Sequence, residues 1–145
     1  MPPTIHRLVP YVYVTDVEAT LDFYALLGFE AGRVERFPDG RLMWAWAECR
    51  GAGGVGPAIM FERSSGPPDP MTRDTFFYMH CDDAEGLRAR LLAAGLGDGG
   101  RFLGRGTSPM TPRTVYEMSR PAYMPGGEFR VHDPDAYAIL IGQCE

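Results

Sequence analysis

The side chains best suited to bind a ligand are aromatic residues at every second position of predicted strands. Tyr11 and Tyr13 alternate with Val12 and Val14, so an extended strand places the two pairs on opposite faces of a sheet. The valines match the apolar helix that follows, whereas two phenolic hydroxyls buried there without partners would each cost about 1–3 kcal/mol. The tyrosine face is therefore predicted to be open. Its rings could bind aromatic or cationic compounds, because they bury apolar area and attract cations.

Four further residues extend this candidate site. Tyr78 and His80 have the same spacing in another predicted strand, and Trp44 and Trp46 share one face of a third. The tryptophans either line the binding surface or pack in a subunit interface. His80 is the candidate catalytic residue because imidazole titrates near neutral pH, although a hydrogen-bonding wall residue is the alternative. The predicted ligand-binding residues are Tyr11, Tyr13, Trp44, Trp46, Tyr78 and His80.

A repeated unit positions these residues. Residues 9–28 read as a strand, a capping residue, a helix and a closing glycine, with Thr15 or Asp16 as the cap and Gly28 at the end. Residues 76–95 repeat this order, and Asp83 and Gly95 match Asp16 and Gly28 at one constant offset. Internal duplication is therefore the simplest interpretation.

The remaining chain completes both halves with short strands. In the first half we expect strands at 31–36, 41–49 and 58–62 with a turn at 37–40. In the second half we expect strands at 75–81, 128–132 and 137–141. Residues 95–112 should be mostly loop with a short strand near Phe102, and residues 113–118 are either a strand or part of a long loop. The predicted fold class is α+β, a single domain (1–145) of two βαβββ modules, 7–63 and 74–143, joined by a linker at 64–73.

Composition excludes several classes of protein. The chain has 145 residues, of which 45% are hydrophobic and 23% charged, as in a soluble globular domain. The net charge of −5 disfavours nucleic acid as a partner, and no apolar run is long enough to span a membrane. Cys49, Cys81 and Cys144 form no CxxC pair, which indicates reduced thiols. With no apolar signal core at the N-terminus, we expect a cytoplasmic protein.

The two ends of the chain resemble a known family. The opening VPYVYVTDVEATLDFYALLGF and the closing GGEFRVHDPDAYAILIGQ are similar to the glyoxalase/bleomycin-resistance/dioxygenase group, the vicinal oxygen chelate superfamily. The resemblance implies two cupped mixed sheets around a groove, usually completed in a homodimer. Ala136 stands where the family usually has glycine in the DPD turn.

Many members of the family hold a divalent metal in the groove, through His, Gln or Glu. The resemblance places the four ligand positions on Val9, Met60, Phe76 and Leu140, which offer neither imidazole nor carboxylate. We therefore expect no metal at this site, and no cofactor.

The function expected from this resemblance is binding. We expect a metal-free protein, similar to bleomycin-resistance proteins, that sequesters a small aromatic or cationic compound. One alternative is a lyase or dioxygenase with displaced metal ligands such as His80, His132 and Glu117. Another is a metal-free acid–base enzyme that uses His80, and a third is a regulatory module without a ligand.

Overall fold

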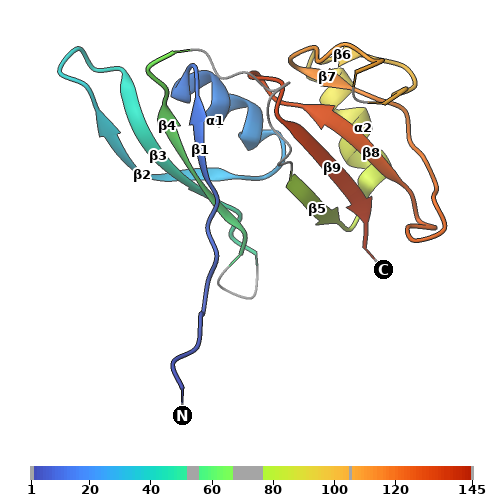
Figure 1. Cartoon of the computed structure of the whole chain (residues 1–145), viewed down its shortest axis with the longest axis horizontal. Coiled ribbons are helices and arrows are strands. Elements are labelled where there is room, and N and C mark those ends of the chain that lie inside the picture. Colours follow the sequence, from blue (N-terminus) through green and yellow to red (C-terminus); the bar gives the residue numbers. More distant parts are fainter. Residues whose placement is uncertain (1, 52–55, 67–76, 105, 145) are drawn as a thin grey trace. The chain divides into compact units, whose positions relative to one another are not determined.

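The computed structural model describes residues 2–51, 56–66, 77–104 and 106–144. The chain divides into two compact units, Met1–Pro68 and Asp69–Glu145. Within the described residues, each unit contains one sheet and one helix (Figure 1). The grouping of both modules into a single domain stays a prediction, and much of the predicted linker lies outside the described residues. None of the described helices is long and apolar enough to cross a membrane.

The first unit is a βαβββ module. Its elements are β1 (Tyr11–Val14), α1 (Val17–Ala25), β2 (Glu30–Arg36), β3 (Leu42–Glu48) and β4 (Ala58–Arg63). The strand order is β1-β4-β3-β2, with β1 parallel to β4 and the other pairs antiparallel. The module predicted from the sequence is therefore confirmed in this unit.

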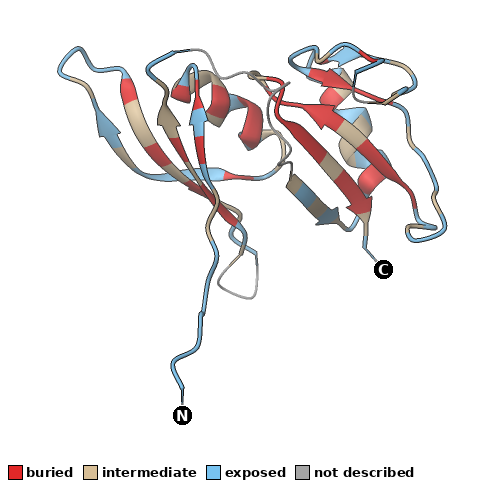
Figure 2. Ribbon diagram, in the orientation of Figure 1, coloured by how far each residue is buried: buried red, intermediate tan, exposed pale blue. Residues whose placement is uncertain are grey.

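Local sequence determines where α1 begins and ends. The Asp16 side chain, rather than that of Thr15, accepts a hydrogen bond of 3.0 Å from the Ala19 amide. Gly28 follows the helix with a φ of 94°, a left-handed conformation that favours glycine. The helix then packs on one face of the sheet. Val14, Phe23, Tyr24 and Phe61 are fully buried there, and Figure 2 marks the buried positions of α1 and the strands.

The second unit repeats this arrangement with one additional strand. Its elements are β5 (Phe77–Cys81), α2 (Ala84–Ala93), β6 (Gly97–Asp98), β7 (Thr114–Val115), β8 (Glu128–His132) and β9 (Ala138–Gln143). The strand order is β5-β9-β8-β7-β6, so the first four strands match the order of the first unit. Asp83 caps α2 by accepting a 2.9 Å hydrogen bond from the Gly86 amide, as Asp16 caps α1. The α+β fold with two βαβββ modules is confirmed.

The predicted strand near Phe102 was wrong. The additional strand lies earlier, at β6, where backbone bonds join it in parallel to β7. The close approach of the chain after β6 to the chain after β7 depends on a glycine, because a Cβ atom on Gly99 would lie 2.5 Å from the Tyr116 ring. Strand formation here follows from backbone pairing rather than side-chain alternation. Only Thr114–Val115 of the predicted 113–118 segment is strand.

The turn between β8 and β9 accommodates Ala136 in the conformation usual for glycine. Ala136 has a φ of 62°, and its amide donates a 2.9 Å bond to the Asp133 carbonyl. The Asp133 side chain accepts bonds of 2.9 Å from the amides of Asp135 and Tyr137. These bonds hold the turn in place despite the Cβ atom of Ala136.

Candidate functional site

The first sheet has one face covered by α1 and one open face. Tyr11 pairs with Met60, which pairs with Trp46 across β3, and Tyr13 is joined to Trp44 through Glu62 in the same way. Directly paired residues share a face, so these side chains lie together on the side away from α1. We call Tyr11, Tyr13, Trp44, Trp46, Glu48, Met60 and Glu62 the first open face. Tyr11 and Tyr13 are each 47% exposed.

Carboxylates and a cation accompany the rings of the first open face. The Tyr11 hydroxyl donates a 2.7 Å hydrogen bond to Glu62 Oε1, which, with partial burial, raises the pKa of Tyr11 to about 12. The Arg7 guanidinium lies over the Trp46 ring, 5.2 Å from its centroid, and 3.7 Å from the Glu48 carboxylate. A hydrogen bond from Trp46 and the nearby arginines lower the pKa of Glu48. This face therefore already holds one cation between a ring and a carboxylate.

The second sheet has a corresponding open face. Tyr78 pairs with Leu140 and His80 with Gly142, and both residues of β9 pair on their other side with β8. Glu128, Arg130 and His132 alternate along β8 with Phe129 and Val131, which are buried on the helix side. We call the side chains on the side away from α2 the second open face. They are Tyr78, His80, Glu128, Arg130, His132 and Leu140.

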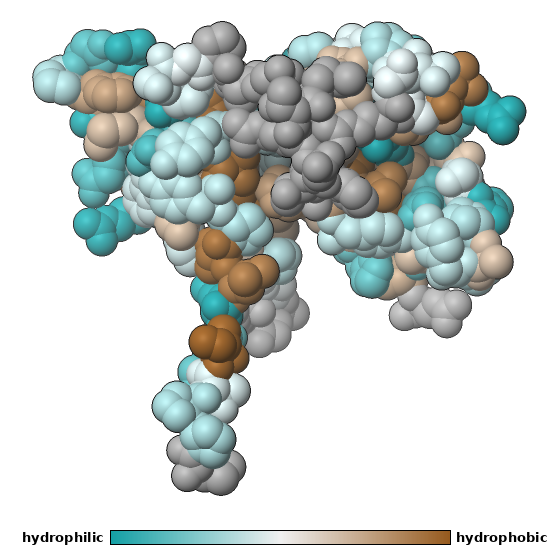
Figure 3. All heavy atoms as spheres, in the orientation of Figure 1, coloured by the Kyte–Doolittle hydropathy of each residue, from teal (hydrophilic) through white to brown (hydrophobic). Residues whose placement is uncertain are grey.

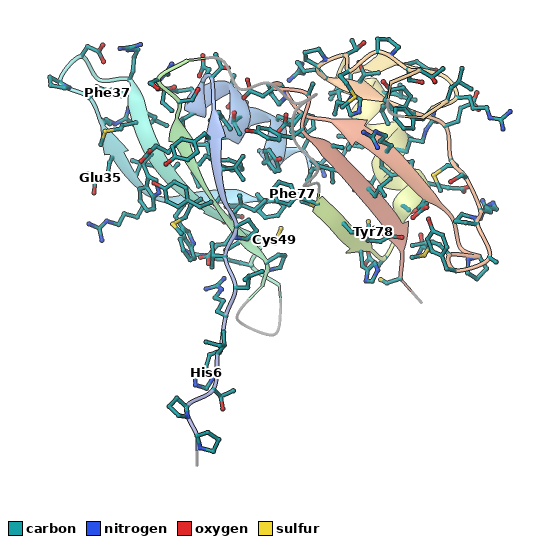
Figure 4. All side chains as sticks on the ribbon, viewed as in Figure 1. His6, Glu35, Phe37, Cys49, Phe77 and Tyr78 are labelled. Atoms are coloured by element: carbon teal, nitrogen blue, oxygen red, sulfur yellow. The ribbon has the colours of Figure 1, made fainter. Side chains whose placement is uncertain are left out.

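Two phenols hold a buried carboxylate on this face. Glu128 is only 5% exposed, and its two carboxylate oxygens accept bonds of 2.5 Å from the hydroxyls of Tyr78 and Tyr123. Gly142 leaves room for this contact, because a Cβ atom there would lie 2.9 Å from the Tyr78 hydroxyl oxygen. Burial and the Glu128 carboxylate raise the pKa of Tyr78 to about 12. Tyr78 projects from β5 (Figure 4).

A second set of contacts holds Arg130. Its guanidinium carbon lies 4.0 Å from the centroid of the Phe102 ring, and its Nε donates a 2.9 Å bond to His132 Nε2. Since Nε2 is an acceptor, the proton of His132 must lie on Nδ1, which donates to the Thr111 carbonyl at 3.0 Å. His132 is fully buried, and burial lowers its pKa to about 4. The imidazole is therefore neutral at pH 7.

A pocket of about 460 Å³ opens beside these side chains of the second open face, and we call it the second pocket. It is lined by Arg101, Phe102, Tyr116, Glu117, Met118, Ser119, Glu128, Phe129, Arg130 and Leu140. This volume lies in the usual range for small-molecule sites. The pocket combines apolar walls with the buried Glu128 carboxylate and the half-buried Arg130 guanidinium.

The structure brings the predicted residues together in two groups. Tyr11, Tyr13, Trp44 and Trp46 share the first open face, and Tyr78 and His80 share the second, with ring centroids 5.5 Å apart. Their role in ligand binding, the catalytic role of His80, and a groove joining both faces stay predictions.

Several residues in and around the second pocket were not predicted from the sequence. Alternation along residues 128–132 could have placed Glu128 and Arg130 on the open face, opposite Phe129 and Val131. Phe102 and Tyr123 come from segments without periodicity, which gave no signal.

The residues at the family's metal positions do not fit a divalent metal. Val9, Met60 and Leu140 carry no imidazole or carboxylate, and Phe76 lies outside the described residues. Leu140 instead lines the apolar part of the second pocket. Elsewhere in the described part of the chain, no three His, Cys, Asp or Glu side chains lie close enough together to hold a metal ion. The displaced-ligand alternative also meets an obstacle, because both ring nitrogens of His132 are already bonded.

No family model and no curated protein matches the chain, whereas solved structures do. A bleomycin resistance determinant encoded on the transposon Tn5 is 20% identical, with a TM-score of 0.66 over 97% of this chain and 99% of that chain. TnmS3, an antibiotic binding protein from Streptomyces sp. CB03234, is 20% identical, with a TM-score of 0.67 over 100% of both chains. A glyoxalase-related enzyme from Clostridium phytofermentans is 10% identical, with a TM-score of 0.68 over 99% of this chain and 98% of that chain. These structures show that the chain has the bleomycin-resistance/glyoxalase fold.

Proposed function

We propose that this protein binds a small aromatic or cationic molecule on its open sheet faces and sequesters it without a metal. The observation that carries this proposal is the composition of the first open face, where four aromatic rings lie beside Glu48 and Glu62. Proteins with the same fold include bleomycin-binding and antibiotic-binding proteins, which supports a binding role.

The chemistry of this face favours a cation or an electron-poor ring. Each cation–π contact contributes about 0.5–2 kcal/mol, and the carboxylates add electrostatic attraction. The Arg7 guanidinium over Trp46 is an internal example of the contact that a ligand cation would make. The proposed ligand-binding residues are Tyr11, Tyr13, Trp44, Trp46, Tyr78 and His80.

A homodimer is part of the proposal. The segment before β1 exposes Ile5 and Leu8, each 86% accessible, and hydrophobic spheres stand out along this segment in Figure 3. Exposed apolar side chains on an extended segment favour packing against a second copy. Light scattering should give twice the mass of the 16.0 kDa chain, and a monomer would contradict the dimer.

An enzyme is the alternative, because one structure with this fold is a glyoxalase-related enzyme. Metal analysis of the purified protein separates the metal-dependent version from the proposal. We expect well under one equivalent of metal and no effect of chelator on the melting temperature, since a metal bound only to the native state would raise it. A stoichiometric metal held by His80 or His132 would contradict the proposal.

Tryptophan emission tests the binding directly, with benzyltrimethylammonium as an aromatic cation probe. We expect saturable quenching, and Tyr11→Ala should weaken the affinity by about threefold to thirtyfold, the loss of one cation–π contact. The control is Phe37→Ala, since Phe37 lies at the β2–β3 turn (Figure 4) and contacts Arg41 there. If Tyr11→Ala lowers the melting temperature but leaves the affinity unchanged, the ring is structural.

A further inference from the structure

Trp44 lies between two carboxylates in the sheet of the first unit. It pairs with Glu62 on β4 and with Glu35 on β2, so all three side chains lie on the side away from α1. The Cβ atoms of such pairs are about 4.5–5.5 Å apart, which lets both carboxylates approach a group held over the indole ring. Glu35 lies on β2 (Figure 4). The row therefore offers one ring and two anions to a ligand.

Trp46, two residues further along β3, already has a cation. The Arg7 guanidinium lies 5.2 Å from its ring centroid, and Arg7 and Arg50 approach the Glu48 carboxylate at 3.7 and 3.1 Å. Among the described residues, no arginine is stacked on the Trp44 ring. The first unit thus has a ring beside a carboxylate twice, and only the pair at Trp46 is filled from within the chain.

The Glu62 carboxylate uses one of its two oxygens. Oε1 accepts the 2.7 Å bond from the Tyr11 hydroxyl, and no ion pair in the part of the chain that the structure describes involves Glu62. A carboxylate has about four acceptor sites, so Oε2 can accept bonds from a ligand. Glu35, by contrast, lies 3.4 Å from Arg33 in an exposed ion pair. Glu62 is therefore the carboxylate better placed to hold a cation over Trp44.

We infer that the ligand's cation is an ammonium group with N–H donors, which lies over the Trp44 ring and donates to Glu62 Oε2. The aromatic part of the ligand then lies over Met60, which pairs with Tyr11 on one side and Trp46 on the other. A cage of rings alone suits quaternary ammonium groups, whereas an ionised acceptor strengthens binding of groups that donate. This inference rests on the proposed binding function and specifies the kind of cation and its place.

Two probes that share a benzyl ring separate a donating cation from one without donors. Isothermal titration calorimetry of the whole chain would compare benzylamine, which is protonated at neutral pH, with benzyltrimethylammonium. We expect benzylamine to bind about threefold to tenfold more tightly, the effect of one hydrogen bond to the half-buried Glu62. Equal affinities, or tighter binding of benzyltrimethylammonium, would overturn the inference.

Matched variants assign this preference to one carboxylate. Glu62→Gln should abolish most of the preference for benzylamine, because glutamine keeps an acceptor for the Tyr11 hydroxyl but has no charge for the ammonium. Glu48→Gln should reduce the preference less, since Arg7 already lies at that carboxylate. The control is Glu85→Gln, an exposed carboxylate of the second unit, which should leave the preference unchanged. A preference that survives in Glu62→Gln, or falls as far in Glu48→Gln, would overturn the inference.

Removing the ring tests the other half of the site. Trp44→Leu should weaken both probes by about threefold to thirtyfold, the loss of one cation–π contact, and circular dichroism checks that the variant is folded. Unchanged affinities in the folded variant would overturn the placement over Trp44.

The two proposals fail in different ways. If benzyltrimethylammonium quenches tryptophan emission but benzylamine binds no more tightly, the binding function stands and the ammonium site is overturned. If neither cation binds, both proposals are overturned.

Discussion

The two open faces use the same phenol–carboxylate pair in different settings. On the first face, the Tyr11 hydroxyl binds Glu62 near solvent, and Tyr11 is 47% exposed. On the second face, the Tyr78 hydroxyl binds Glu128, which is 5% exposed and also held by Tyr123. The first face thus holds its phenol–carboxylate pair near solvent, whereas the second holds it in a buried hydrogen-bond network. One strand order can therefore support two surfaces that are built differently.

The difference comes from the segments that follow the helices. In the first unit, β2 and β3 are seven residues each and leave the open face uncovered. In the second unit, β6 and β7 are two residues each, and the long segments around them add Phe102, Tyr116 and Tyr123 to the sheet. Short strands thus leave chain free to build a pocket.

The two faces should differ most in how much stability is lost when one side chain is removed from each. His132→Ala should destabilise the protein by about 2–4 kcal/mol, because it leaves a cavity and removes the hydrogen bond from Arg130 Nε. Tyr13→Ala, on the first face, should cost about 1 kcal/mol or less, because the side chain is half exposed. Urea denaturation measures both. Similar losses for the two variants would show that the faces are built alike.

Acid should destabilise the second face through His132. The native pKa of about 4 lies below the ordinary value of 6.5, so between these values the unfolded chain binds more protons than the native protein. The free energy of unfolding should therefore fall by about 2 kcal/mol from pH 7.5 to pH 5 through this residue, and stay constant above pH 7.5. Urea denaturation at each pH should show this slope, and His132→Asn should remove it. An unchanged slope in the variant would contradict the assignment.

The turn after β8 gives the smallest effect. Ala136→Gly should stabilise the protein by up to about 1 kcal/mol, because glycine adopts the φ of 62° without steric cost. Ala138→Gly, two residues later in β9, should instead destabilise the protein by roughly 0.5–1 kcal/mol. Glycine in a strand loses more conformational entropy on folding than alanine does. Thermal melts compare the two signs. The same sign for both would show that the turn is not strained.

Prediction from the sequence succeeded where side-chain alternation is strict. The alternation of Tyr11 and Tyr13 with Val12 and Val14 predicted which residues are exposed, and the valines are buried. Trp44 and Trp46 share the predicted face for the same reason. Alternation cannot predict contacts made by loops, so the stacking of Phe102 on Arg130 was not foreseen. The position of β6 was missed because backbone bonds and Gly99 determine it.

The most direct test of the central claim is to map where an aromatic cation binds. Isotope-labelled protein would be titrated with benzyltrimethylammonium and followed by two-dimensional NMR. We predict saturable shifts of the Trp44 and Trp46 indole signals and of β1 and β3 amides, with no shifts around the separate 460 Å³ hollow beside α1, lined by Leu21, Ala25 and Phe29 among others. Shifts confined to that hollow, or no saturable shifts at all, would contradict ligand binding on the open faces.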